Sequence, residues 1–478
     1  MSRYRKLGTG LLTGAFVVVG TSLFYLFLRP VPNAYAIPAF ARKYQTSCAT
    51  CHNNYPELND FGEAFKKNGF KFPKDDDTFV KEPPVLLGAA AQRQAFPKAI
   101  YPGELPGSIP IGFRYSGFAS YNSKQPLSLG FLPRTDLFTP NTFTIIAAGS
   151  LGPSLSFWID DDISAGGSGA DGGLGDGYLK ANDIGRLFHL PKDSLNIRFG
   201  QFELDLPFTQ ARTINPTDYD IYDQASVAGV QGSTDNPFVF AATQRGIELG
   251  GYPHDGNFSW SVSFLNGSND STAARNTKDV YVRVSQKFNF DRDHSTRKEV
   301  QASGPTGPHD HTSLRIGAFY YYGRNALNVD RSLFPDFGTI HEPFYRVGGD
   351  FRFKHQNFEL YGLGMYGHDS NLIPNTDTFT LDRGAPVTFS GGFVQAQYWF
   401  YPWLIGIMRY DAVNSPTDAL NGLSVHDTRN RFSPGVQFLI RANLKMVFEY
   451  QHRWKTPLGD AGQFFRANGA VAGIDYSF

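Results

Sequence analysis

The sequence predicts a mainly β fold: a transmembrane antiparallel β-barrel of about 16 strands, preceded by a small α-helical segment. Segments after Ile111 alternate between polar and apolar residues with period two. Aromatic residues make up 15% of the chain and glycine is abundant at 50 residues, whereas charged residues reach only 18%. No apolar run after the first thirty residues is long enough to cross a bilayer as a helix, which excludes a helical membrane bundle.

Charge and cysteine content exclude other classes of protein. The 44 basic and 44 acidic side chains balance, so we expect no nucleic-acid partner. Two cysteines are too few for a disulfide framework.

Residues 1–36 have the pattern of a signal peptide. Arg3, Arg5 and Lys6 form a basic start, an apolar stretch runs over residues 11–28, and Ala34-Tyr35-Ala36 offers a small-x-small cleavage site. We therefore expect the mature protein to begin at Ile37, although the long apolar stretch could instead serve as an uncleaved anchor.

Both cysteines belong to one motif, Cys48-Ala49-Thr50-Cys51-His52. In a C-x-x-C-H motif the two thiols add to the vinyl groups of haem, and the histidine becomes the proximal iron ligand. The motif predicts one covalent haem c, bound by Cys48 and Cys51 with His52 on the iron. The alternative is a small disulfide or redox loop beside an incidental histidine.

Residues 37–80 are expected to form a monohaem cytochrome c segment that acts as a plug, joined to the barrel by a linker over 81–110. Leu58, Phe61 and Phe65 share one face of a helix expected from Pro56 to Lys67. The segment is too short for a hydrophobic core of its own, so haem should supply much of the buried surface and its loss should unfold the segment.

The distal haem ligand is left open by the sequence. The segment has no methionine and no histidine besides His52. The iron is then five-coordinate, weakly held by a group such as Asn53, Asn54 or a lysine, or bound by a residue from the rest of the chain.

Residues 111–478 are expected to form the outer-membrane barrel. Phe258 to Phe264 alternates aromatic or branched residues with serine, and the chain ends in Phe478, which resembles the assembly signal of bacterial outer-membrane barrels. An even strand number returns the C-terminus to the periplasm, with short inner turns and long outer loops. The long connection 290–312 is an exception among the inner turns. The expected strands are 111–121, 141–149, 153–160, 177–187, 195–204, 244–252, 257–265, 279–289, 313–322, 344–353, 358–367, 391–400, 403–411, 432–441, 444–453 and 468–478.

Three weaker features of the sequence have simple structural explanations beside the functional ones. His309-Asp310-His311 could bind a metal, but a solvated loop also explains it. Asp160-Asp161-Asp162, with Asp171 and Asp176, could attract a cation. Four arginines on expected strands are candidates to line the lumen, and no catalytic residue is assigned; the arginines are Arg114, Arg198, Arg283 and Arg315.

The N-terminal segment resembles the fused monohaem cytochrome-porins of iron-oxidising bacteria. The residues that carry the resemblance are Ile37 to Arg42, Cys48 to His52, Tyr55 to Leu58 and Phe61 to Phe70. The resemblance implies oxidation of extracellular Fe(II), an Fe(II):cytochrome c type of oxidoreductase, with electrons passed to a soluble periplasmic cytochrome. The alternative substrate is another extracellular electron donor in place of Fe(II).

Membrane physics independently favours a haem placed inside the barrel. The hydrocarbon core is roughly 30 Å thick, and a haem held below it could not exchange electrons with the cell exterior. We expect the protein in the cell outer membrane, in contact with its lipid, and the haem segment in the lumen or on its periplasmic side. Two alternatives remain: a diffusion porin with a periplasmic haem appendage, and outward electron transfer to an extracellular acceptor.

Overall fold

A computed structural model describes most of the chain after the predicted signal peptide; residues 1–36, Asp171 and residues 309–311 lie outside the described residues. Among the described residues, no helix is long and apolar enough to cross a membrane. The described ranges are 39–72, 76–81, 85–86, 94–95, 104–105, 107, 110–122, 135–152, 154–163, 173–209, 217–225, 240–253, 256–267, 278–290, 312–327, 340–370, 372–375, 380–383, 386–418, 423–455 and 468–477.

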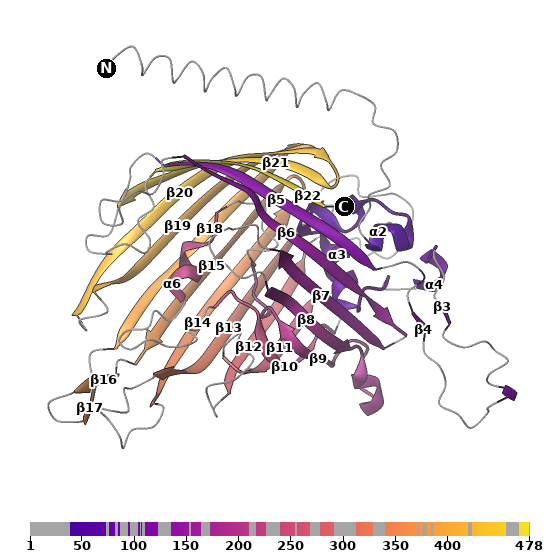
Figure 1. The fold of residues 1–478 in the computed structure, drawn as a ribbon, viewed down its shortest axis with the longest axis horizontal. Coiled ribbons are helices and arrows are strands. Elements are labelled where there is room, and N and C mark those ends of the chain that lie inside the picture. The colour runs from indigo at the N-terminus through magenta and orange to yellow at the C-terminus, as the bar shows by residue number, and fades with distance from the viewer. Residues whose placement is uncertain are drawn as a thin grey trace, which may run out of the picture. The chain divides into compact units, whose positions relative to one another are not determined.

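Sixteen antiparallel strands form a closed barrel (Figure 1), which confirms the predicted fold class and strand number. Each strand pairs with the next along the chain, and β22 pairs with β5 to close the ring, with Tyr476 opposite Tyr115. The barrel strands are β5 (Ile111–Asn122), β6 (Thr135–Leu151), β7 (Leu155–Ile163), β8 (Gly173–Ala181), β9 (Asn196–Phe202), β10 (Gln244–Gly251), β11 (Phe258–Leu265), β12 (Asp279–Asn289), β13 (Ser313–Leu327), β14 (Ile340–His355), β15 (Phe358–Asp369), β18 (Val387–Tyr401), β19 (Leu404–Asp418), β20 (Leu423–Arg441), β21 (Leu444–Lys455) and β22 (Gly469–Ser477). Three two-stranded sheets of the described residues are separate from this ring: β1 (His52–Asn54) with β2 (Glu57–Leu58), β3 (Val85–Leu86) with β4 (Glu104–Leu105), and β16 (Leu372–Asn375) with β17 (Thr380–Arg383).

The alternation of the strands places polar side chains inside the barrel and apolar ones outside. Ser261 and Ser263 of β11 are 3% and 0% exposed in the interior, whereas Phe264 is 47% exposed on the outer face. Aromatic and branched residues continue this outer face around the barrel, including Phe199, Ile247, Ile316, Val347, Val394, Met408, Phe448 and Tyr450. Such an apolar exterior around a polar interior is the pattern of a barrel in lipid.

The two ends of the barrel differ in their connections. At one end, strands are joined by two-residue turns such as 356–357, 402–403 and 442–443, and we call this the short-turn end. The opposite, long-loop end carries connections such as 203–243. The expected strand 177–187 is wrong at its far end, because β8 stops at Ala181. Asp183 then adopts a left-handed conformation with φ 54°, and the 3₁₀ helix η2 (Ile184–Phe188) follows.

The N-terminal segment, described over residues 39–72 and 76–81, contains only short elements. In chain order they are α2 (Ala39–Tyr44), the 3₁₀ helix η1 (Cys48–Thr50), β1 (His52–Asn54), β2 (Glu57–Leu58), α3 (Asp60–Lys67) and α4 (Asp76–Phe79). The helix expected from Pro56 begins only at Asp60, because the Asn59 side chain caps it by accepting a hydrogen bond from Gly62 N at 2.8 Å. The helix ends as expected near Gly69, which has φ 69°.

Polar contacts tie the N-terminal segment to the inside of the barrel near the short-turn end. The Asp60 carboxylate pairs with Lys287 at 2.7 Å and with Lys354 at 3.1 Å. Lys180 donates a hydrogen bond to the Lys67 carbonyl at 2.8 Å. These three lysines lie on β12, β14 and β8, each within two residues of the strand's short-turn end. The segment therefore touches well-separated parts of the wall.

Apolar contacts join the same segment to β6 and β7. The Phe70 ring is 3% exposed and lies 5.5 Å from Trp158, measured between ring centroids. Ala148 of β6 is also 3% exposed and belongs to the same cluster. The rest of the cluster comes from the segment itself: Phe40, Tyr44, Phe61, Phe65, Phe72, Phe79 and Val80. The barrel wall thus completes a core that the segment is too small to build alone.

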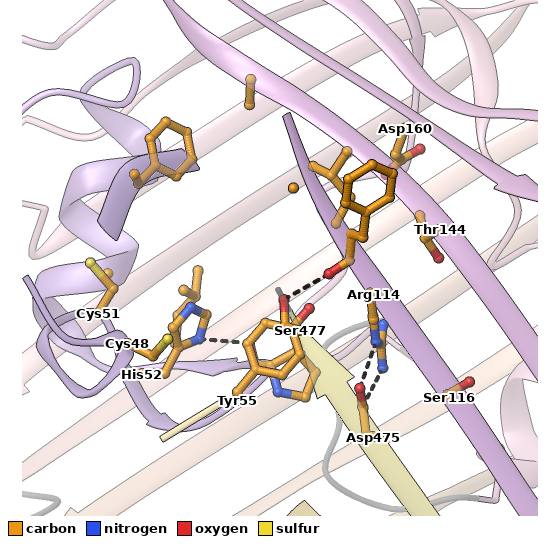
Figure 2. Close-up of a pocket in the computed structure, with 18 of the residues that line it drawn as sticks. Cys48, Cys51, His52, Tyr55, Arg114, Ser116, Thr144, Asp160, Asp475 and Ser477 are labelled. Carbon is orange, nitrogen blue, oxygen red and sulfur yellow. Dashed lines mark hydrogen bonds and ion pairs between the residues drawn. The ribbon is translucent and has the colours of Figure 1, made fainter. Parts of the chain in front are cut away.

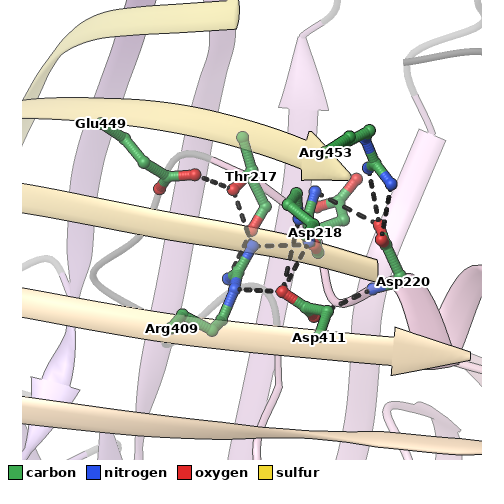
Figure 3. A network of polar contacts seen from close by, with 8 residues as sticks. Thr217, Asp218, Asp220, Arg409, Asp411, Glu449 and Arg453 are labelled. Atoms are coloured by element: carbon green, nitrogen blue, oxygen red, sulfur yellow. Dashed lines mark hydrogen bonds and ion pairs between the residues drawn. The ribbon is translucent and has the colours of Figure 1, made fainter. Parts of the chain in front are cut away.

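A second part of the chain packs against the inner wall of the barrel. We call residues 203–243 the lumen loop, of which 203–209, 217–225 and 240–243 are described; it contains α6 (Asp220–Ala225). Tyr219, Ile221 and Phe240 are at most 1% exposed and pack against wall residues such as Tyr321 and Phe393. Polar contacts in Figure 3 join the loop to β19, β20 and β21.

Candidate functional site

The Cys48 to His52 motif has a compact conformation that brings its reactive side chains close together. Ser47 caps η1 by accepting a hydrogen bond from Ala49 N, and Cys51 N donates to the Cys48 carbonyl at 3.1 Å. Asn59 binds the motif to α3, because its side chain donates to the Thr50 carbonyl at 3.1 Å. A Cβ on Gly62 would lie 2.0 Å from the Cys51 carbonyl oxygen, so only glycine allows α3 to pack here.

The His52 imidazole is held by a backbone carbonyl. Its Nδ1 lies 3.2 Å from the Pro56 carbonyl oxygen (Figure 2). A proton on Nδ1 donates to this carbonyl and leaves Nε2 without a proton, which is the arrangement of a histidine that binds a metal through Nε2. Burial lowers the pKa of His52 to about 4, so the ring is neutral near pH 7.

Cys48, Cys51 and His52 line one cavity of about 640 Å³ between the N-terminal segment and the barrel wall. This volume lies within the range of pockets that hold cofactors and drug-sized ligands. Burial raises the pKa of Cys51 to about 12 and also raises that of Cys48, so both are neutral thiols in the folded protein. The apolar part of the lining includes Phe40, Phe65, Phe70, Phe113, Val447 and Ile474.

Charged groups line the cavity wall on β5, β21 and β22 and on β7. Arg114 and Lys445 both contact Asp475, at 2.8 and 3.5 Å, on the side of β5, β21 and β22. Asp160 and Asp162 line the cavity from β7, where Asp162 is paired with Thr144 of β6, the residue opposite Arg114. Figure 2 shows Arg114 and Asp475 near His52 and Asp160 farther from it.

The alternation of side chains along β7 separates Asp161 from Asp160 and Asp162. Asp160 and Asp162 line the cavity together with Asp176 of β8, whereas Asp161 is not among the lining residues. Within the described part of the chain, no group of three or more histidine, cysteine or acidic residues is arranged to hold a metal ion. The cation site considered from sequence is therefore not formed by these described residues.

The cavity also bears on the distal ligand. Among the described residues that line it, His52 is the sole histidine and methionine is absent. Asn53 and Asn54, considered from sequence, are not in the lining, while two lysines, Lys66 and Lys445, are. No strong distal ligand is therefore offered by the described lining.

These residues fit a c-type haem. Two thiols and an imidazole whose Nδ1 lies against the Pro56 carbonyl line one partly apolar cavity, and this is the donor set that covalent attachment and proximal ligation require. The site residues expected from sequence are thus brought together. Of the four arginines expected in the lumen, Arg114 alone is among the described lining residues.

Lys445 and Asp475 were missed by sequence reasoning. Both are at most 6% exposed and point into the barrel. The signal was present in the alternation of β21, since Lys445, Val447 and Glu449 are buried whereas Phe448 is exposed on the outer face. If the alternation of buried and exposed residues had been followed back to the start of β21, it would have placed Lys445 inside the barrel.

Comparisons with known proteins give similarity to solved barrels only. No family model matches the chain, and no curated protein matches it. OmpF of Salmonella typhi, solved with daunomycin, is 14% identical, with a TM-score of 0.45 over 77% of this chain and 97% of that one. The outer-membrane channel DcaP of Acinetobacter baumannii is 16% identical, with a TM-score of 0.43 over 77% of this chain and 96% of that one. The anion-selective porin from Comamonas acidovorans is 13% identical, with a TM-score of 0.47 over 77% and 98%.

Proposed function

We propose that this chain is an outer-membrane electron-transfer protein that oxidises extracellular Fe(II) and passes electrons to a soluble periplasmic cytochrome. A single haem c would be held by Cys48, Cys51 and His52 inside the barrel. The observation that carries the proposal is that all three residues line one cavity within the lumen. The N-terminal resemblance to cytochrome-porins of iron-oxidising bacteria supports the choice of Fe(II) as donor.

The exterior of the barrel supports the membrane part of the proposal. An apolar band surrounds it, and Phe400, Tyr401 and Trp403 are at least 50% exposed near the short-turn end. Aromatic side chains at this level are typical of the boundary between hydrocarbon and water. In single-chain outer-membrane barrels the short turns face the periplasm. The N-terminal segment would then lie where a periplasmic electron acceptor can reach it.

The packing of two described parts of the chain inside the barrel favours the electron-transfer proposal over the diffusion porin. The N-terminal segment is fixed near the short-turn end, and the lumen loop packs Tyr219 and Phe240 against the wall. Both rings are at most 1% exposed. Diffusion of solutes needs a continuous water-filled channel. Electron transfer needs only a fixed carrier at a short distance from its donor and its acceptor.

The proposed reaction moves one electron in each turnover. Extracellular Fe²⁺ becomes Fe³⁺, and one ferric periplasmic cytochrome becomes ferrous. The bound haem supplies a one-electron carrier between them. The chain's own contribution is to fix the carrier: His52 is held by the Pro56 carbonyl, and α3 packs on the Cys51 carbonyl through Gly62.

Proteoliposomes that enclose a ferric c-type cytochrome test the proposal. External Fe(II) should reduce the enclosed cytochrome when the barrel carries haem. The matched control is a Cys48→Ala/Cys51→Ala variant, which lacks both attachment points. An enclosed dye measures leakage in the same vesicles.

Three results would count against the proposal. A purified mature chain without covalent haem would remove its basis. Reduction of the enclosed cytochrome at equal rates in the double-cysteine variant would show that the haem is not the carrier. Dye release without reduction would favour the diffusion porin. Vesicles that enclose a reduced cytochrome, with an acceptor outside, test the outward direction separately.

A further inference from the structure

A cationic corner lies beside the Cys48 to His52 motif in the cavity wall. Arg114 of β5 donates to the Asp475 carboxylate of β22 through Nε at 3.2 Å and Nη2 at 2.8 Å. The Lys445 ammonium of β21 lies 3.5 Å from the same carboxylate. The side chains of Arg114, Asp475 and Lys445 are 21%, 8% and 4% exposed. We call these three residues the β5–β21–β22 trio.

The trio carries one more positive than negative charge. Two cations share the Asp475 carboxylate, and the pair with Lys445 is the longer one. Glu57 also acts on Lys445, but its carboxylate is paired with Arg352. Asp162 acts on Arg114 from β7. Burial of a surplus charge is costly unless a counter-charge completes the group.

The trio is next to the predicted iron ligand. The Arg114 guanidinium lies 5.8 Å from the centroid of the Tyr55 ring, and the Tyr55 and His52 ring centroids are 5.1 Å apart. Arg114, Lys445, His52 and both cysteines all line the same cavity. Figure 2 shows Tyr55 lying between His52 and the Arg114–Asp475 pair.

We propose that Arg114 and Lys445 bind the propionate carboxylates of the haem and so couple the cofactor to the barrel wall. This inference rests on the proposed function, because it requires haem at the motif. A haem has two propionates on one edge, and guanidinium and ammonium groups are strong partners for carboxylates. The Asp160 carboxylate, which lines the cavity from β7, disfavours placing a propionate beside it.

Resonance Raman spectroscopy and spectroelectrochemistry of the purified holoprotein test this assignment. The variants are Lys445→Gln and Arg114→Gln, with Lys445→Arg as the charge-preserving partner. Arg315→Gln is the control, since Arg315 is a part-buried arginine bound to Ser285 and Gly256 and is not among the described cavity-lining residues. Heat-modified migration in gels confirms that each barrel is folded.

The expected result has two parts. The propionate bending band shifts, and the haem potential falls, in Lys445→Gln and Arg114→Gln, because loss of a nearby positive charge favours the ferric state. Lys445→Arg and Arg315→Gln keep the original band. An unchanged band in both glutamine variants would overturn the propionate assignment and leave the proposed function intact. A parent chain without covalent haem would overturn both.

Discussion

The contact between the lumen loop and the wall can be weakened through one loop carboxylate. Asp220, at the start of α6, contacts two wall arginines (Figure 3). It binds Arg453 at 3.1 and 3.3 Å and Arg431 at 3.2 Å. These side chains are at most 7% exposed. An Asp220→Asn variant keeps the size of the side chain and removes its charge.

The free-energy cost of this substitution depends on the partners that Arg431 keeps. Removing one partner of a buried ion pair costs about 3–5 kcal/mol. Arg431 keeps the Asp411 carboxylate at 3.1 Å and the Asp218 carbonyl, so the cost should lie near the lower end, about 3 kcal/mol. Since about 1.4 kcal/mol corresponds to a factor of ten, the population with an undocked loop should rise roughly 10²-fold.

Single-channel recording in planar bilayers measures this population as time spent in an open state. Asp218→Asn is the matched control, because Asp218 lies in the same loop, is exposed, and accepts hydrogen bonds from Arg409 and Arg431 through its backbone carbonyl. We expect longer or more frequent openings in Asp220→Asn than in the control. Identical conductance in both variants and the parent would refute the idea that this ion-pair group holds the loop in the lumen.

Three further predictions concern the N-terminal segment. A Gly62→Ala change places a Cβ 2.0 Å from the Cys51 carbonyl, so covalent haem per barrel should fall, as measured by haem absorbance against protein. A Phe70→Ala change removes a ring that is 3% exposed and should cost about 3–5 kcal/mol of segment docking, seen as faster proteolysis of the segment; equal proteolysis would contradict this. Burial, and next the Glu359 carboxylate, raises the pKa of Glu57 above its ordinary 4.5. A raised pKa gives stability that is present at low pH and lost as pH rises through the folded-state value. Glu57→Gln should therefore flatten the pH dependence of segment release above pH 4.5, and an unchanged profile would exclude this role.

Strand positions could be predicted well because each strand has two environments. A side chain of a lipid-embedded barrel faces either hydrocarbon or a polar lumen. Polar and apolar residues therefore alternate in the sequence of each strand, as in Phe258 to Phe264. Strand ends were less predictable. β6 begins at Thr135, six residues before its expected start. β8 ends at Ala181 because the chain turns at Asp183, which alternation does not reveal.

The site was predictable only where one chemical motif lies in consecutive residues. Cys48, Cys51 and His52 are fixed by spacing, whereas Arg114, Lys445 and Asp475 come from strands at opposite ends of the barrel sequence. They meet because β22 closes on β5. The packing of the described residues 203–209, 217–225 and 240–243 inside the barrel was not predicted either, since the apolar residues of a loop do not show by themselves which surface covers them.

The closing pair of strands explains how the N-terminal segment, the proposed haem carrier, can be held by both ends of the chain. β5 follows the segment and β22 ends the chain, so the wall beside the motif exists only when the ring is complete. Arg114 and Asp475 come from these two strands, and Lys445 comes from the neighbour of β22. If the trio binds the propionates, the cofactor reaches its final position only in a closed barrel. The rate of electron tunnelling depends steeply on distance. A haem fixed to rigid strands would stay at constant distances from its electron donor and acceptor, whereas a haem on a tethered appendage would not.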